Sequence, residues 1–198
     1  MTPIQTTGKR EENLPNRRDF HHSACCLIPG FFALSGKPLP KEQESGLERH
    51  TDDRIAIALM RFKMGYHCSQ CIFEAYAEDF GIEPKMARRI AAGLAGGSTV
   101  GGECGVLGSG YLVLGLKYAP RMPAHGNTER EEKLWASIRK LVADFKRIHG
   151  SLTCRELLGV DVFTSEGWRE AVRKGLFTKK CHNHIRDAIT IIDSMDSA

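Results

Sequence analysis

The sequence predicts an all-α fold: a single compact domain of several helices, in which a glycine-rich loop leads into a central buried helix. Two observations predict this class. Apolar residues recur at helical spacing along most of the chain beyond residue 50, and no stretch alternates polar and apolar residues for long enough to favour a sheet. With 198 residues, 41% of them hydrophobic and 26% charged, the chain is large enough to bury one sizeable core.

The helices are predicted from their end signals as well as from their apolar faces. Thr51-Asp52-Asp53 caps the first helix, which ends at Gly65, and Glu83-Pro84 starts the third, because proline is tolerated at the first helical position. A capping box at residues 128–131 opens a long amphipathic helix that ends before Gly150. The other predicted helices are residues 66–79, 106–116, 154–158 and 165–177, and a last one with Cys181, Ile185, Ala188 and Ile192 on one face.

Residues 96–102, with the sequence GGSTVGG, form the glycine-rich loop that precedes Cys104. They lack the G-x-x-x-x-G-K-[ST] pattern of a phosphate-binding loop and follow no predicted strand, so nucleotide binding has little support. Glycine instead lets the backbone approach something closely, either a neighbouring helix or a ligand bound by Cys104. The apolar segment 106–116 is the predicted central helix.

Residues 1–35 are predicted to be an export signal of the twin-arginine type. Arg17-Arg18 is followed two places later by Phe20, and the apolar run 24–34 is too short to span a bilayer. Cleavage before Gly36 leaves a linker at 36–50 and a helical, cysteine-rich domain at 51–198. The alternative is an unstructured tail with a chance arginine pair. An exported protein is expected in the periplasm, with membrane contact only during export.

Charge and motif patterns exclude several function classes. The net charge is +4 and no Lys/Arg-rich block stands out, so the sequence does not favour nucleic-acid binding. The sequence shows neither a Ser/His/Asp set nor an H-E-x-x-H motif, so it does not indicate a hydrolase. Covalent haem attachment requires C-x-x-C-H, but Ile72 follows Cys71.

The cysteines carry the chemical argument. Two of the seven cysteines belong to the predicted leader. Four of the others lie where predicted helices begin: Cys68, Cys104, Cys154 and Cys181. The free N–H groups and positive partial charge of a helix N-terminus lower the pKa of a thiol and stabilise the thiolate, which binds metals and drives redox exchange. The fifth, Cys71, forms a C-x-x-C with Cys68, which suits either a metal ligand pair or a dithiol.

Two histidines are further candidate ligands or proton carriers. His67 adjoins Cys68, and His184 follows Cys181 by one helical turn. A neutral imidazole at either position could replace a thiolate as ligand or move a proton.

At these residues the chain resembles the small redox-active proteins named for their C…GCAxxG…C…C cysteine pattern. The resemblance covers residues 52–192 and implies a helical fold, redox activity centred on the four cysteines and an iron–sulfur cluster as cofactor. Val106 and Ser109 depart from the central motif, and Cys71 is additional to the four. The matching segments are Gly65-Tyr66-His67-Cys68-Ser69-Gln70, Gly102-Glu103-Cys104-Gly105, Leu114-Gly115-Leu116-Lys117-Tyr118, Cys154-Arg155-Glu156-Leu157-Leu158-Gly159, and Cys181 with residues 185–188.

The leading interpretation is an exported redox or electron-transfer protein in which Cys68, Cys104, Cys154 and Cys181 converge to ligate an iron–sulfur cluster, with Cys71 as an alternative ligand. Its expected partner is another redox protein or a membrane electron-transfer complex. Two other interpretations stay open. One is a thiol–disulfide module without metal. The other is a disulfide-stapled, non-enzymatic binding protein.

Overall fold

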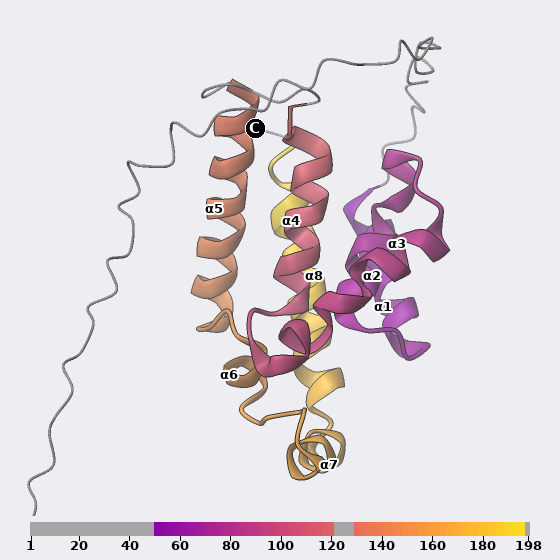
Figure 1. Cartoon of the computed structure of the whole chain (residues 1–198), viewed down its shortest axis with the longest axis vertical. Helices are drawn as coiled ribbons and strands as arrows, with labels where there is room; N and C mark the ends of the chain where they lie inside the picture. The colour runs from indigo at the N-terminus through magenta and orange to yellow at the C-terminus, as the bar shows by residue number, and fades with distance from the viewer. Residues whose placement is uncertain (1–49, 121–128, 197–198) are drawn as a thin grey trace, which may run out of the picture. The chain divides into compact units, whose positions relative to one another are not determined.

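The computed structural model describes residues 50–120 and 129–196 (Figure 1). Within these residues every regular element is helical, and the one β contact is an isolated bridge between Glu103 and Thr153. The all-α prediction is therefore confirmed. The predicted leader, residues 36–49 of the linker and Thr128 of the capping box lie outside the described residues. The α-helices are α1 (Thr51–Lys63), α2 (Cys68–Ala75), α3 (Pro84–Ala91), α4 (Gly105–Tyr118), α5 (Glu129–His149), α6 (Cys154–Leu158), α7 (Ser165–Lys174) and α8 (His182–Asp193).

The central helix is α4, as the apolar segment 106–116 predicts. It packs against α2, α5 and α8, and Figure 1 shows it between α5 and the group of α1, α2 and α3. A helix that is apolar on all sides suits such a surrounded position. No helix in the described part of the chain is both long enough and apolar enough to cross a membrane. The largest fully buried side chains include Tyr76, Phe145, Ile72, Leu107, Leu114, Leu141, Ile185, Ile189 and Ile192.

Two glycines let α4 lie close to its neighbours. A Cβ atom on Gly105 would be 2.5 Å from the carbonyl oxygen of Leu94, and one on Gly110 would be 2.6 Å from Leu141 Cδ2. Between them, the hydroxyl of Ser109 donates a buried hydrogen bond of 2.8 Å to the carbonyl of Ser69 in α2. For these glycines the close approach is to neighbouring chain segments, one of the two alternatives that the sequence left open.

Three helix ends differ from their predictions. His50, not Thr51, occupies the cap of α1, and no side chain bonds to the free amides there, so the predicted Thr51-Asp52-Asp53 cap is wrong. The predicted helix 66–79 divides into α2 and a 3₁₀ turn at Ala77–Phe80. At α7, the left-handed Gly175 (φ 62°) ends the helix three residues earlier than predicted.

Buried charges in the bundle are paired. Arg54 donates to Asp79 at 2.7 Å and lies 3.4 Å from Asp193, whose carboxylate also accepts the hydroxyl of Tyr76 at 2.7 Å. The guanidinium of Arg54 lies over the Tyr76 ring at 4.6 Å. These contacts join α1, the 3₁₀ turn and α8, because a buried charge is tolerated only where partners compensate its lost hydration.

Candidate functional site

Cys68 is the first residue of α2, and hydrogen bonds at that end fix its position. The Oε1 atom of Gln70 accepts the backbone N–H of His67 at 3.1 Å, while its Nε2 donates to the carbonyl of Arg88 in α3 at 3.1 Å. The start of α2 is thereby attached to its neighbour. Cys68 is half-buried, whereas the other cysteines of the described residues are buried.

Cys104 and Cys154 are held together by the backbone. The N–H of Cys104 donates to the carbonyl of Leu152 at 2.8 Å, and the N–H of Cys154 donates to the carbonyl of Gly102 at 2.7 Å. This reciprocal pair forms the isolated bridge. Cys104 caps α4 and Cys154 begins α6, where Thr153 Oγ1 accepts the N–H of Glu156 at 3.3 Å. Both cysteines therefore stand at helix N-termini, as predicted.

The glycine-rich loop makes a left-handed turn beside Cys68. Four successive residues, Gly96, Gly97, Ser98 and Thr99, have φ between 54° and 70°. Glycine is required at 97, because a Cβ atom there would be 2.3 Å from the carbonyl oxygen of Gly102. Ser98 and Thr99 adopt the same region with side chains, which is a strained conformation.

Cys181 ends a π-helical turn, Phe177–Cys181, that continues directly into α8. The prediction that it starts a helix holds for α8 only, because the residues before it are helical too. Its side chain packs with Cys154 and Leu158 in a small buried cluster. Lys180 anchors the turn by donating to the carbonyls of Leu157 at 2.8 Å and Leu158 at 3.3 Å, at the C-terminus of α6.

The thiols of Cys68 and Cys104 share a hydrogen bond and have opposite pKa shifts. A hydrogen bond from the Cys104 side chain is the largest cause that lowers the pKa of Cys68; burial opposes it, and the backbone N–H groups of Ser69, Gly96 and Cys68 support it. The same bond, together with burial and the charge of Cys68, raises the pKa of Cys104 well above its usual value, although the N–H of Val106 opposes the shift. Of the two thiols, Cys68 is therefore the one that loses its proton first.

The remaining thiols stay neutral beside Cys68. Burial, the charge of Cys68 and that of Asp161 raise the pKa of Cys154 to about 11. Burial and the charges of Cys68 and Cys154 raise the pKa of Cys181, with Lys180 opposing them. The sequence predicted lowered pKa values at all four helix starts. This prediction is wrong for Cys104, Cys154 and Cys181, because desolvation outweighs what the helix termini contribute.

Cys71 has a different environment. It is 0% exposed, belongs to the hydrophobic core and donates its thiol to the carbonyl of Tyr66 at 3.6 Å. Burial and the charges of Cys68 and Glu74 raise its pKa to about 12. It lies one helical turn from Cys68 but is protonated and inaccessible, so the two cysteines of the C-x-x-C are unequal.

The candidate histidines differ as well. His184 is buried in an aromatic cluster, with its ring 4.5 Å from that of His149 and 5.7 Å from that of Phe145. Burial and the positive charges of His149 and Lys180 lower its pKa to about 4, so the imidazole is neutral at pH 7. His67 lies at the cap of α2, beside Cys68.

The donor set suits an iron–sulfur cluster in its chemistry. Cys68 and Cys104 share a hydrogen bond, Cys154 and Cys181 pack in one small buried cluster, and the charge of Cys68 raises the pKa of both members of that cluster. Backbone N–H groups are directed at two of the sulfurs, those of Cys68 and Cys104. Among residues 50–120 and 129–196, no group of three or more Cys, His, Asp or Glu side chains is arranged to hold a single metal ion. In a cluster the cysteines bind several irons, so their sulfurs stand farther apart than the ligands of one ion. The cysteines of the described residues are free thiols.

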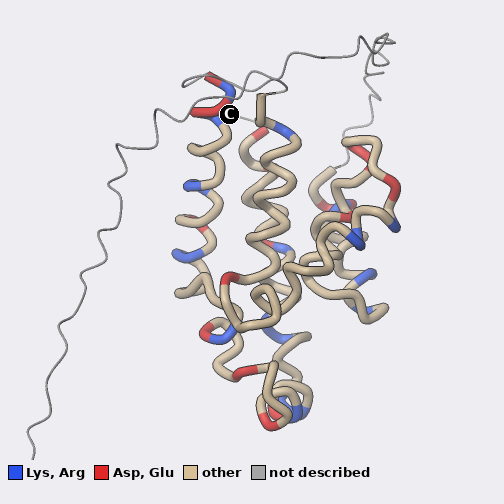
Figure 2. The backbone as a smooth tube through the Cα atoms, viewed as in Figure 1, with Lys and Arg blue, Asp and Glu red and all other residues tan. Residues whose placement is uncertain are grey.

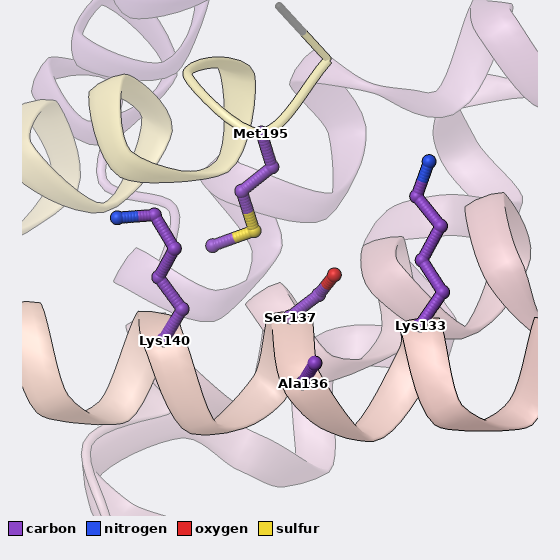
Figure 3. Close-up of a pocket in the computed structure, with 5 residues that line it drawn as sticks. All are labelled: Lys133, Ala136, Ser137, Lys140 and Met195. Atoms are coloured by element: carbon purple, nitrogen blue, oxygen red, sulfur yellow. The ribbon is translucent and has the colours of Figure 1, made fainter. Parts of the chain in front are cut away.

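A separate hollow of about 270 Å³ lies between α5 and the residues after α8 (Figure 3). The picture shows Lys133 and Lys140 standing on α5 at either side of Met195. None of the predicted site residues lines it. Its lining residues are Lys133, Ala136, Ser137, Lys140 and Met195.

Sequence reasoning missed the neighbours of the cysteines. The ring of Phe163 lies directly over Gly96, where a Cβ atom would be 2.2 Å from Phe163 Cζ. Arg155 Nη2 donates to the carbonyl of Val100 at 3.4 Å and pairs with Asp161 at 2.8 Å, which holds the glycine-rich loop against α6. The Gly96-Gly97 pair was a visible signal of close approach, but nothing in the sequence indicates what approaches it.

A family model matches residues 66–195, and the family is described as "Putative redox-active protein (C_GCAxxG_C_C)". No curated protein and no solved structure matches the chain. The matched range contains Cys68, Cys104, Cys154 and Cys181, in the order in which the resemblance places them. Because this range is more than half of the chain, the chain belongs to this redox-active family.

Proposed function

We propose that the protein is an exported electron-transfer protein in which Cys68, Cys104, Cys154 and Cys181 ligate an iron–sulfur cluster. One observation carries the proposal: the charge of Cys68 on α2 raises the pKa of Cys104, Cys154 and Cys181, as it does that of its near neighbour Cys71, although these three belong to the start of α4, the start of α6 and the turn before α8. A dithiol needs only two sulfurs. Four cysteines around one point are the usual ligand set of a cluster.

The surroundings of the sulfurs support this chemistry. The amides of Ser69 and Gly96 at Cys68, and of Val106 at Cys104, would donate hydrogen bonds to ligand sulfurs and raise the reduction potential. Metal binding would replace the protons of the neutral thiols, which removes the cost of burying thiolates. Cys71 is the alternative ligand, although it is held by the carbonyl of Tyr66.

The test is the visible absorption spectrum, with iron, sulfide and zinc analysis, of the protein purified without oxygen from cells able to build clusters. A brown protein with matching iron and sulfide is expected. Cys104→Ser should lose the colour, whereas the control Cys71→Ser should keep it, because Cys71 faces the core. A colourless wild-type protein without iron would overturn the cluster.

The hydrogen bond between Cys68 and Cys104 favours a second candidate, thiol–disulfide exchange. The Cys68 thiolate would attack a substrate disulfide and release one thiol. Cys104 would then attack the mixed disulfide, release the second thiol and leave a Cys68–Cys104 disulfide, so that two protein thiols are oxidised and one disulfide is reduced. Peptide mapping after oxidation of the metal-free protein tests this. A disulfide between any other two cysteines would contradict it.

A further inference from the structure

Large apolar side chains are exposed around the cysteine site. Phe163, Trp168 and Val172 are 47%, 51% and 56% exposed. Trp168 and Val172 lie four residues apart and so share one face of α7, whose inner face is the buried pair Gly167 and Ala171. Figure 1 shows α7 beyond the ends of α4 and α5. We call Phe163, Trp168 and Val172 the α7 surface.

The α7 surface contacts the elements that hold the cysteines. Phe163 covers Gly96, whose N–H is directed at Cys68. Trp168 packs against Phe177 with ring centroids 5.1 Å apart, and Phe177 begins the turn that ends at Cys181. A molecule bound to the α7 surface would therefore be separated from Cys68 by Phe163 and Gly96, and from the turn that ends at Cys181 by Trp168.

Positive charge gathers at the C-terminal end of α7. Residues 173–180 include four Lys or Arg and no Asp or Glu, whereas residues 161–172 include one Arg and three Asp or Glu. Figure 2 shows residues of both charge signs along α7. Its acidic groups are engaged: Glu166 pairs with Arg169 at 3.2 Å, and Glu170 pairs with Lys174. Arg173 has no ion pair within the part of the chain that the structure describes, so its charge faces solvent at the edge of the surface.

We propose that the α7 surface is the docking site for an acidic redox protein that exchanges electrons with the cysteine site. This inference rests on the proposed redox function. Aromatic side chains in the middle of an interface, with arginines around them, supply most of the binding energy in protein complexes. The basic edge at residues 173–180 attracts an acidic partner and repels a basic one. The partner is thus defined by charge: acidic residues around an apolar centre.

The experiment measures binding of the full chain to two one-electron carriers by calorimetry at low and at high salt. The probes are an acidic plant-type [2Fe–2S] ferredoxin and the basic cytochrome c. Trp168→Ala and Arg173→Glu are compared with matched changes on α5, Trp135→Ala and Arg139→Glu; the Trp135 side chain is 46% exposed, close to the 51% of Trp168. Circular dichroism verifies that each variant is folded.

Ferredoxin should bind and should bind more weakly at high salt, and each α7 variant should weaken binding about tenfold while the α5 variants change it little. The inference is wrong if ferredoxin does not bind, if cytochrome c binds equally well, or if the α5 variants have the same effect. Binding is measured whether or not the protein is coloured. A colourless protein that binds ferredoxin as expected would overturn the iron–sulfur cluster alone. A brown protein whose α7 variants bind ferredoxin as tightly as the wild type would overturn the docking site alone.

Discussion

Within the cysteine site, Cys68 has the lowest tendency to hold its proton. Its pKa is lowered because Cys104 and three backbone N–H groups donate toward its sulfur, which outweighs the cost of burial. The neighbouring thiols remain protonated because they are buried beside that sulfur. Whatever binds or reacts here first meets one thiolate, and the other sulfurs must then lose protons.

Replacing Cys104 by Ala should make Cys68 less reactive at neutral pH. The hydrogen bond from Cys104 lowers the pKa of Cys68, so the thiolate persists to lower pH in the wild type. Without that bond the pKa rises, and at a pH below it each unit of the rise lowers the thiolate fraction about tenfold. The higher intrinsic nucleophilicity of the more basic thiolate reduces the net slowing of alkylation to about three- to fourfold per unit. The measurement is the iodoacetamide rate against pH on metal-free protein, with Cys68 identified by mass spectrometry.

Cys71→Ala is the control for this experiment, because the Cys71 thiol donates to Tyr66 rather than to Cys68. Its alkylation profile at Cys68 should match the wild type. An unchanged profile in Cys104→Ala would show that the amides alone hold the thiolate.

At the scale of single residues, sequence reasoning identified the cysteines but not their ionisation. Cys68, Cys104 and Cys154 stand at helix starts as predicted, since local caps such as Thr153 can be recognised in the sequence. Which of them is charged depends on burial and on the hydrogen bond between Cys68 and Cys104. Both arise from the packing of α2 on α4, and no local pattern encodes that contact.

Among the described elements, the left-handed turn is the one that holds non-glycine residues at positive φ, Ser98 and Thr99. Thr99 has φ 64°, a region that costs a non-glycine residue about 1–2 kcal/mol. Thr99→Gly should therefore raise the free energy of unfolding by about 0.5–1 kcal/mol, measured by urea denaturation. Gly97→Ala should lower it by about 1–3 kcal/mol, because its Cβ would meet the backbone of Gly102. A Thr99→Gly variant less stable than the wild type would show that the side chain contributes more than the strain costs.

The close packing of α4 makes a second prediction at this scale. Gly110→Ala should destabilise the protein by about 1–3 kcal/mol, because the new methyl group would overlap Leu141. On the same helix, Gly115 has no atom within 4 Å of the corresponding position. There Gly115→Ala should stabilise by about 0.5–1 kcal/mol through helix propensity. Thermal or urea denaturation compares the two, and equal effects would contradict this account of the packing.

Helix ends that capping residues or proline mark in the sequence were predictable, whereas turns without such residues were not. Pro84 and Glu83 locate the start of α3, where the Glu83 carboxylate accepts the N–H groups of Lys85 and Met86. The left-handed turn was missed because Ser98 and Thr99 are not residues that favour it. The π-helical turn before α8 has no recognisable signal, since its geometry follows from how Lys180 is tied to α6.

For the whole chain, the proposed export route has a direct test. Replacing Arg17-Arg18 by Lys-Lys should keep the protein in the cytoplasm if the leader is read as a twin-arginine signal. Cell fractionation with antibodies to the folded domain measures the distribution, and a cytoplasmic enzyme assayed in the same fractions controls for leakage. If the Lys-Lys variant reaches the periplasm as fully as the wild type, export does not depend on the arginine pair. A wild-type protein found only in the cytoplasm would overturn export itself.

The two reciprocal hydrogen bonds between the Cys104 and Cys154 loops bear on the order of folding. They join backbone segments about 50 residues apart in sequence, and α4 and α5 lie between them. Contacts between such distant segments cost loop-closure entropy, which the packing of the intervening helices must offset. The last of the four cysteines, Cys181, follows Cys154 along the chain, with the rest of α6 and with α7 in between. The site is therefore a property of the finished fold: a nascent or truncated chain carries the cysteines without their arrangement, and whatever loads or oxidises them must act on the folded protein.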